Sequence, residues 1–322
     1  MGGYHHGEIA VQERAGLARQ AGQSQGAIGN SIPDVAVAFL AQQPHVVVGG
    51  TDERGRVWAT QLTGEPGFLS VAGPRTLNIG VLPPPEDPLA RLLSGAGTGA
   101  GAGAGPGTGT GEEPARIGMI GIEPGTRRRM RMNGRAVREG QGLRVELDQV
   151  IANCPKYIQK RDHRTAVATA AGPVRRTAVD SVELSPPQQR VLRAADTFFV
   201  ATTSDRGDAD ASHRGGNPGF VQVLSPRLLR WPDYLGNAMF LTLGNLELNP
   251  AAGLFVPGWE TGTSLHLTGS ARTVWDEEEV ARHPGAQRLV EFEITAVREI
   301  AAASPLRWSA PLYSRFNPPT SG

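Results

Sequence analysis

The sequence predicts a mainly β protein that has a few helices and is built from two tandem β-barrels. Three observations lead to this class. A segment of the N-terminal half recurs in the C-terminal half, and apolar residues in both halves alternate with a period of two. Strand patterns also follow one another without regular alternation with helices, which favours closed antiparallel barrels over a parallel sheet.

The internal repeat is clearest in one pair of segments. Val46–Leu77 aligns without gaps with Phe198–Leu229, at a shift of 152 residues, and the two are identical at 13 of 32 positions. Each copy contains an apolar strand, a polar turn with Arg-Gly, a second strand, the motif Gly-x-Pro-Gly-Phe and a third strand. Agreement in both residues and spacing predicts that the two copies share one fold.

The repeat continues more weakly in two further pairs of segments, Gly118–Gly125 with Gly253–Gly262 and Met130–Ala136 with Leu265–Ala271. In the second pair, Met130 and Met132 are expected to face the core, while the arginines beside them face away from it. Glu291–Val297 alternates in the same way and predicts another strand.

Helices are expected at a few places between these strands. Each copy has room for one helix between its third and fourth strands, and the helix of the second copy should end before Pro250. The expected helices are Asn237–Leu248, about Pro88–Leu93, Val11–Ala21, Glu277–Ala281, and a connecting helical region over Gly142–Ala152 and Cys154–Arg161.

These patterns divide the chain into parts. They are an N-terminal helical segment (1–30), a first barrel repeat (31–140) with a Gly/Ala insertion (94–114), a helical connector (141–180), a second barrel repeat (181–300) and a C-terminal tail (301–322). The insertion is almost purely Gly, Ala and Thr. It has too little side chain to bury to offset the entropy of ordering, so we expect a disordered surface segment.

The composition excludes several classes of function. Because 32 Lys and Arg stand against 31 Asp and Glu, no basic footprint for nucleic acid is present. No apolar run approaches the ~20 residues that span a bilayer, and no secretory signal opens the chain, so we expect a soluble, cytoplasmic protein without a membrane partner. The single cysteine, Cys154, excludes an internal disulfide and a multi-thiolate metal site. His5, His6 and Glu8 have no second cluster of ligands, so we expect no metal.

The segment Ser212–Phe220 carries the densest set of functional side chains. Its glycines let a ligand approach the backbone, and its Ser, His and Arg at a strand end are suited to phosphate or a polar ring edge. The first copy has different polar residues at Thr60–Phe68, so we expect one principal site, mainly in the C-terminal copy. No hydrolase spacing and no phosphate-binding Gly-rich loop occurs.

Two other basic segments leave alternatives open. Lys156, beside Tyr157 and Gln159, offers a charge and donors to an anionic ligand, but an ordinary helix surface fits as well. Arg127–Arg129 with Arg131 forms a basic strand edge, for which a solvated face is favoured over a phosphate site in this arginine-rich chain.

Several segments together resemble the pyridoxamine 5'-phosphate oxidase-like flavin-nucleotide-binding proteins. They are Ala195–Thr203, Ser212–Phe220, Pro232–Asn237 and Phe240–Leu246, with Asn153–Gln159, Tyr4–Glu8 and Val11–Ala15 similar to the long members. The resemblance implies split β-barrels that bind FMN between two barrels. Since both barrels lie in this chain, it implies two tandem split barrels that form an intrachain pseudo-dimer.

The resemblance also implies a cofactor and a set of residues that bind it. The cofactor is FMN, or another flavin or a deazaflavin, with Arg214 or Lys156 near its phosphate and the backbone amides of the Gly216–Phe220 turn near its ring. The expected cofactor-binding residues are Lys156, Ser212, His213, Arg214, Gly216, Pro218, Gly219, Phe220, Asn237, Thr242 and Asn245. No catalytic side chain is named, because a flavin carries the hydride chemistry itself.

The leading functional prediction is an FMN-dependent oxidoreductase that takes hydride from NAD(P)H or a small substrate. The substrate-phosphate residues of the vitamin-forming oxidases are not found, so oxidation of pyridoxamine phosphate is not predicted. The alternatives are a non-catalytic flavin, deazaflavin or haem binding protein, and a structural double barrel with a vestigial site. A homodimer stays open, because an internal pseudo-dimer removes the usual need for one without forbidding it.

Overall fold

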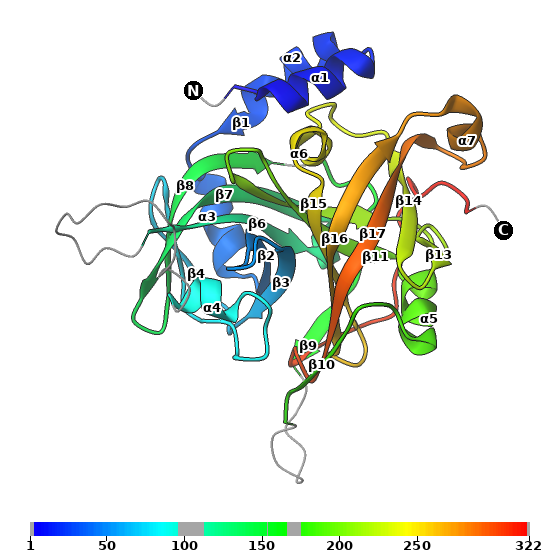
Figure 1. The fold of residues 1–322 in the computed structure, drawn as a ribbon. Helices are drawn as coiled ribbons and strands as arrows, with labels where there is room; N and C mark the ends of the chain where they lie inside the picture. Colours follow the sequence, from blue (N-terminus) through cyan, green and yellow to red (C-terminus); the bar gives the residue numbers. More distant parts are fainter. Residues whose placement is uncertain (1–2, 96–112, 153, 166–174, 321–322) are drawn as a thin grey trace.

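The structure is a computed structural model that describes residues 3–95, 113–152, 154–165 and 175–320 (Figure 1). Apart from two residues at each end, the predicted disordered insertion at 94–114 lies outside this part of the chain. Within it, no helix is long and apolar enough to cross a membrane.

Two eight-stranded antiparallel sheets make up most of the fold. The first has the order β3-β2-β6-β7-β8-β5-β4, with β1 also paired to β8, and the second has the order β12-β11-β15-β16-β17-β14-β13, with β10 also paired to β17. The two orders correspond strand by strand. The predicted mainly β fold with two tandem barrels is therefore confirmed.

The strands of the first sheet are β1 (Ile28–Gly29), β2 (His45–Thr51), β3 (Val57–Thr63), β4 (Leu69–Gly73), β5 (Thr76–Ile79), β6 (Ala115–Glu123), β7 (Arg128–Glu139) and β8 (Gly142–Ala152). Those of the second are β10 (Thr177–Ser181), β11 (Thr197–Thr203), β12 (Ala209–Gly215), β13 (Gln222–Ser225), β14 (Leu228–Tyr234), β15 (Ala251–Pro257), β16 (Ser264–Val274) and β17 (Ala286–Ala301). A third, two-stranded sheet pairs β9 (His163–Thr165) with β18 (Leu306–Trp308).

Short helices connect and cover the barrels. They are α1 (His6–Arg14), α2 (Ala18–Ser24), α3 (Asp34–Ala41), α4 (Ala90–Ser94), α5 (Pro186–Ala194), α6 (Leu241–Leu248) and α7 (Glu277–Ala281), with 3₁₀ turns η1 (Gln25–Ala27) and η2 (Pro124–Thr126). In Figure 1, α1 and α2 lie together at the top of the molecule, above α6.

The predicted helical connector is wrong over Gly142–Ala152, which forms strand β8. Leu143, Val145 and Leu147 are buried and alternate with exposed residues, so the segment has the period of a strand. The first barrel therefore extends to residue 152 instead of ending at 140. The described residues of Cys154–Arg161 contain no helix either, and Lys160 forms a β-bridge with Leu312.

Other predicted helix bounds also change. The helix expected at Val11–Ala21 is interrupted near Gly16, whose φ of +67° is left-handed, so two helices form there. The second-copy helix begins at Leu241 instead of Asn237, because Ala238 and Phe240 have φ of 60° and 58°. The first-copy helix is Ala90–Ser94, and Glu277–Ala281 is helical as predicted. The C-terminal segment is packed: it contributes β18, and its residues Ser314 and Asn317 hydrogen-bond to Gln159.

The two barrels pack against each other through the outer faces of equivalent strands. In β2, Val46 and Val48 belong to the first barrel core, whereas Val47 belongs to a separate apolar cluster between the barrels. In β11, Phe198 lies in the second core, and Phe199 lies in the cluster between the barrels. Strands that are apolar on both faces thus bury one face in their own barrel and the other against its partner.

Two equivalent glycines allow this close approach. A Cβ on Gly118 of β6 would lie 2.4 Å from the backbone Cα of Asp210 in β12. A Cβ on Gly253 of β15 would lie 2.6 Å from the backbone Cα of Trp58 in β3. Since these two glycines are partners in the internal repeat, the barrels form an intrachain pseudo-dimer with matching contacts on both sides.

Candidate functional site

One cavity lies where the two barrels meet α6. Its volume is about 140 Å³. Ile120 and Arg129 line it from the first barrel, while Ser212 and Pro232 line it from the second. Side chains from both barrels therefore meet at this cavity.

Seven of the eleven residues predicted to bind a cofactor line this cavity. They are Lys156, Ser212, His213, Arg214, Phe220, Asn237 and Thr242. They come from the segment after β8, from β12, from the turn before β13 and from α6 with the segment before it. The structure therefore brings together residues up to 86 positions apart, between Lys156 and Thr242, around one cavity.

Gly216, Pro218 and Gly219 do not line the cavity. The Gly216 N–H donates to the Asp196 carbonyl at 3.1 Å, and the Gly219 N–H donates to the Arg193 carbonyl at 2.9 Å. A Cβ on Gly216 would lie 2.6 Å from the Phe220 ring, so this glycine makes room for that ring. The turn supports the second barrel, and its amides are not directed at the cavity.

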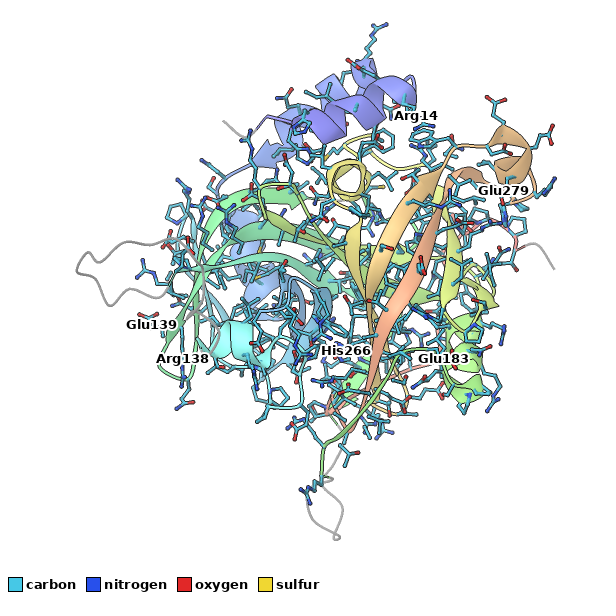
Figure 2. All side chains as sticks on the ribbon, in the orientation of Figure 1. Arg14, Arg138, Glu139, Glu183, His266 and Glu279 are labelled. Carbon is cyan, nitrogen blue, oxygen red and sulfur yellow. The ribbon has the colours of Figure 1, made fainter. Side chains whose placement is uncertain are left out.

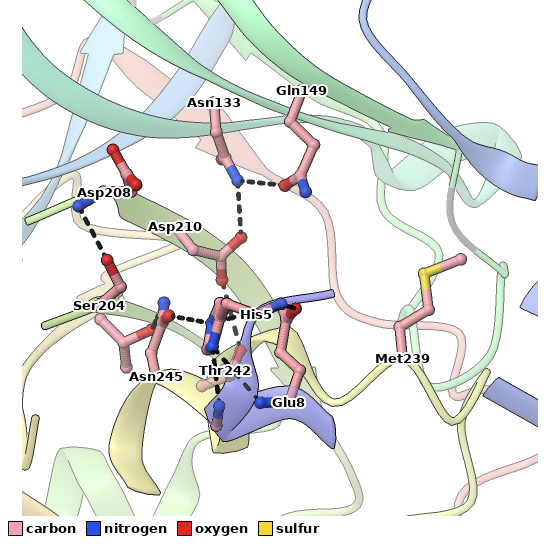
Figure 3. A network of polar contacts seen from close by, with 12 residues as sticks. His5, Glu8, Asn133, Gln149, Ser204, Asp208, Asp210, Met239, Thr242 and Asn245 are labelled. Atoms are coloured by element: carbon pink, nitrogen blue, oxygen red, sulfur yellow. Dashed lines mark hydrogen bonds and ion pairs between the residues drawn. The ribbon is translucent and has the colours of Figure 1, made fainter. Parts of the chain in front are cut away.

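Asn245 lies below the cavity in a polar network drawn in Figure 3. Its Nδ2 donates to Thr202 Oγ1 at 3.0 Å, and its Oδ1 accepts from His5 Nε2 at 3.0 Å. Asn245 therefore joins α6 to the N-terminal segment. The same network includes Asp210, which accepts from Thr242 Oγ1 at 3.4 Å and from Asn133 at 3.3 Å.

Arg129 and Arg131 correct the expectation of a solvated basic strand edge. Both face away from their own barrel core as predicted, but the second barrel covers that face, and both line the cavity. Arg131 is 9% exposed; its Nε donates to Asp210 at 3.0 Å, and the two side chains form an ion pair. Arg129 donates through Nη1 to His213 Nδ1 at 2.9 Å. Nδ1 is then the acceptor, which leaves the proton of a neutral His213 on Nε2.

The cavity concentrates positive charge. The cations that line it are Arg129, Arg131, Lys156, Arg214 and Arg288, and the carboxylate among its described lining residues is that of Asp233. Burial and the nearby Arg214 and Arg131 lower the pKa of Arg129 to about 10. Burial also lowers the pKa of Arg214, and burial with Arg129 and Arg214 lowers the pKa of His213 well below its usual value. Burial is the main cause of these shifts, and repulsion from neighbouring arginines adds to it.

Some of these guanidinium groups have donors left over. Within the described residues, Arg129 Nε, Arg214 Nε and Arg288 Nη1 are buried and have no hydrogen-bond partner. Arg214 Nη1 donates to Ser212 Oγ at 2.9 Å and to the His213 carbonyl at 3.1 Å, so its position is fixed. Buried donors without a partner are costly unless a ligand accepts from them. The arrangement can therefore accept an anion.

Aromatic rings and strained backbone surround the rest of the cavity. Arg288, 4% exposed, lies against the rings of Phe240 and Trp275 at 4.7 and 5.3 Å, and its Nε is 3.4 Å from Asp233. Tyr157 and Tyr234 pair at 5.2 Å between ring centres, and burial raises the pKa of Tyr234 to about 12. Tyr157, Ala238 and Phe240 all have left-handed φ, and such backbone strain often clusters at ligand sites.

The equivalent position on the other side of the pseudo-dimer is closed. Gln61, Phe255 and Ser264 stand where the functional cavity has His213, Ile120 and Arg129. The space there is about 10 Å³, because Trp259 and Trp308 fill it. His266, labelled in Figure 2, takes the place of Arg131 and hydrogen-bonds to the Ala59 carbonyl and to Ser264. This twin site holds no cation cluster among its described residues.

The polar network beneath the cavity contains one carboxyl group with a shifted pKa. Glu8 of α1 is 4% exposed, and burial raises its pKa to about 7, although its acceptance of the His5 N–H at 2.8 Å acts in the opposite direction. Asp210 raises this pKa and Arg131 lowers it. The folded protein therefore binds the Glu8 proton more tightly than the unfolded chain does.

This predicts that Glu8 stabilises the fold most at low pH. Its contribution is complete below about pH 4.5 and is lost as the pH rises through about 7, a change of about 3 kcal/mol for a shift of this size. The variant Glu8→Gln should lack this loss, so the difference in unfolding free energy between variant and wild type should grow in favour of the variant between pH 5 and pH 8. Urea unfolding of both proteins at pH 5 and pH 8 measures this difference. An equal difference at the two pH values would contradict a raised pKa of Glu8.

Comparison with known proteins gives likenesses of limited extent. No protein-family model matches the chain, and no curated protein matches it. A Lactobacillus delbrueckii protein provisionally described as a pyridoxamine 5'-phosphate oxidase has 17% identity over 36% of this chain and 93% of its own, with a TM-score of 0.30. An FMN-binding protein from Syntrophomonas wolfei has 9% identity, over 35% and 84%, with a TM-score of 0.28. An FAD-binding protein from Mycobacterium smegmatis has 18% identity, over 38% and 98%, with a TM-score of 0.27.

Each match therefore covers about a third of this chain and most of the other protein's chain. The tandem-barrel fold is established by the strand pairing described above, and the site by its own residues.

Proposed function

We propose that the protein binds a flavin-type nucleotide in the cavity between its barrels, FMN first among the candidates, and that it acts as an oxidoreductase. One observation carries the proposal: the half-buried side chains of Arg129 and Arg214 line one cavity, and each keeps a buried Nε without a partner. A phosphate group accepts hydrogen bonds from such donors and neutralises their charge.

The balance of charge supports a ligand with about two negative charges. Arg131 is paired with Asp210, and Arg288 lies beside Asp233, so these two cations have carboxylate partners. Arg129 and Arg214 have no carboxylate within ion-pair distance among the described residues. A phosphate monoester carries about −1.5 to −2 at neutral pH, which fits this pair.

The remaining walls suit a planar ring system. Ile120, Phe220 and Leu243 give an apolar surface, and Tyr234 adds an aromatic ring. Ser212 and Thr242 hydrogen-bond to each other at 2.9 Å and offer polar contacts between the apolar wall and the arginines. An apolar cavity with a few placed polar groups is the usual form of a cofactor site.

A bound flavin would supply the hydride chemistry, and the residues of this chain would bind and orient it. Arg129 holds His213 in its neutral form with the Nε2 proton available to donate. Lys156 is half-buried beside the cavity mouth, where its ammonium group suits an anionic reductant such as NAD(P)H. This assignment requires no acid–base pair.

Equilibrium dialysis against FMN, FAD and a deazaflavin nucleotide tests the proposal. Riboflavin is the matched control, because it has the same ring and lacks the phosphate; we expect it to bind at least about a hundredfold more weakly than FMN. A protein that takes up none of the nucleotides overturns the proposal. If NADH or NADPH bleaches the bound flavin, the result supports an oxidoreductase function. If neither donor reduces the bound flavin, the protein is a flavin carrier.

We expect one flavin per chain, although the fold repeats. The twin site is filled by Trp259 and Trp308 and lacks the arginine pair. Titration of a known chain concentration with FMN should therefore saturate at one equivalent, and Gln61→Ala, in the twin site, should leave both the stoichiometry and Kd unchanged. Saturation at two equivalents would show that the twin site opens.

A further inference from the structure

Three side chains donate hydrogen bonds to backbone carbonyls of Leu235–Phe240, the segment that forms one wall of the cavity. Tyr157 Oη donates to the Leu235 carbonyl at 3.0 Å, and Ser24 Oγ donates to the Asn237 carbonyl at 2.8 Å. Gln12 Nε2 donates to the Met239 carbonyl at 3.2 Å. Every second carbonyl of the wall thus has a donor, and two of the three donors come from the N-terminal helices α1 and α2.

These two helices are an addition to the repeat. Helix α3 corresponds to α5 at the shift of 152 residues, and β1 corresponds to β10 at the edge of its sheet. Among the described residues, no helix precedes β10 as α1 and α2 precede β1. The helices therefore serve only one of the two pseudo-equivalent positions, the one with the cavity.

The helices are seated firmly on α6, which forms the floor of the cavity. A Cβ on Gly7 of α1 would lie 2.3 Å from the carbonyl oxygen of Gly244 in α6, so the backbones of α1 and α6 are in contact. The hydrogen bond from His5 to Asn245 adds a polar link, and Leu17, between α1 and α2, itself lines the cavity. Figure 3 shows His5 and Glu8 of this segment beside Thr242 and Asn245 of α6.

The wall needs such support because its backbone is strained. Ala238 and Phe240 are not glycine and have φ of 60° and 58°, a left-handed conformation that is strained for residues with a Cβ. Inside the wall, the Met239 N–H donates to Asn237 Oδ1 at 3.2 Å. A strained segment of this kind keeps its shape only when its surroundings hold it.

We propose that Gln12 and Ser24 are positioning residues of the ligand site, which hold the wall Leu235–Phe240 in the shape that encloses a flavin nucleotide. Neither residue lines the cavity; each acts through a backbone carbonyl of the wall. The identity of the ligand rests on the proposed function. The support of the wall rests only on the two hydrogen bonds from Gln12 and Ser24.

The double variant Gln12→Ala/Ser24→Ala of the full chain tests the proposal. FMN should dissociate from it about tenfold faster than from the wild type, since two hydrogen bonds that hold the wall are lost. The matched control Glu13→Ala/Gln20→Ala changes exposed residues of the same two helices and should leave the rate unchanged. The single variant Ser24→Thr keeps the hydroxyl group, so FMN should dissociate from it as slowly as from the wild type.

Hydrogen exchange of the ligand-free proteins tests the wall without any flavin. Amides of residues 235–240 should exchange at least about tenfold faster in the double variant than in the control, while those of the barrel strands stay unchanged. Equal exchange in the two proteins overturns the inference, whether or not FMN binds. Faster exchange together with no flavin binding would overturn the proposed function and leave the positioning role supported.

Discussion

Arg214→Gln should weaken FMN binding by about a hundredfold. The substitution removes a buried positive charge and the donors that we assign to the phosphate, and a charge-assisted hydrogen bond contributes about 1.5–3 kcal/mol. Arg214→Lys keeps the charge and loses the planar fork, so its affinity should lie between those of the wild type and of the glutamine variant. Riboflavin affinity should change far less, because that ligand has no phosphate to lose contact with.

The same variant should not lose stability in the absence of ligand. Burial is the main cause of the lowered pKa values of Arg129 and Arg214, and repulsion from neighbouring arginines adds to it. Removing one cation relieves that repulsion, so the ligand-free Tm of Arg214→Gln should equal or exceed that of the wild type. A residue that serves only the fold would behave in the opposite way.

Differential scanning calorimetry with and without FMN measures both effects on one protein. Arg190→Gln, an exposed arginine on α5, is the control for a change of net charge and should bind FMN like the wild type. If Arg214→Gln binds FMN as tightly as the control does, the arginine pair is not the phosphate site.

The sequence located one wall of the cavity and missed the other for a physical reason. Ser212, His213 and Arg214 were found because they interrupt a repeated strand with functional side chains. A period of two shows which side chains point away from their own barrel core, but it does not show what covers that outer face. For this reason the pattern places Arg129 and Arg131 in solvent. The apolar outer residues of the neighbouring strands, Val47 and Ile120, were the available signal that this face is covered.

The repeat also explains why the glycine turn was misassigned. Glycines at 216 and 219 suggested a close approach of the ligand, but Gly-x-Pro-Gly-Phe occurs in both copies, including the one whose twin site is closed. A Cβ on Gly64 would lie 2.5 Å from Phe68, just as one on Gly216 would lie 2.6 Å from Phe220. A motif shared by an open and a closed site belongs to the scaffold, whereas the residues in which the copies differ are the candidates for contact with a ligand.

The strand β8 was missed because its last residues hide its period. Leu143, Val145 and Leu147 alternate cleanly, but Val150 and Ile151 are both buried and suggest a helical face. Pairing with β7 shifts register between Asn133 and Gly134, which changes the face that later residues of β8 present. A bulge of this kind depends on the partner strand and cannot be read from the segment alone.

Gly118→Ala should separate the barrels and destroy the site together with much of the stability. The new Cβ would lie 2.4 Å from the Cα and carbonyl carbon of Asp210, which are backbone atoms and cannot turn aside. Overpacking of this kind costs about 3 kcal/mol, so we expect Tm to fall by roughly 5–10 °C. Because Asp210 pairs with Arg131 across the same contact, FMN affinity should fall as well.

Gly121→Ala is the matched control, since it makes the same change three residues later on β6. Its Cβ would meet Leu40, Phe39 and Met132 side-chain atoms at 3.5–3.8 Å, which is ordinary van der Waals contact within the first barrel. This variant should keep both Tm and FMN affinity, although the substitution and the strand are the same. If Gly118→Ala is as stable as Gly121→Ala, the barrels do not meet at β6 and β12, and the cavity that depends on their contact is lost with that interface.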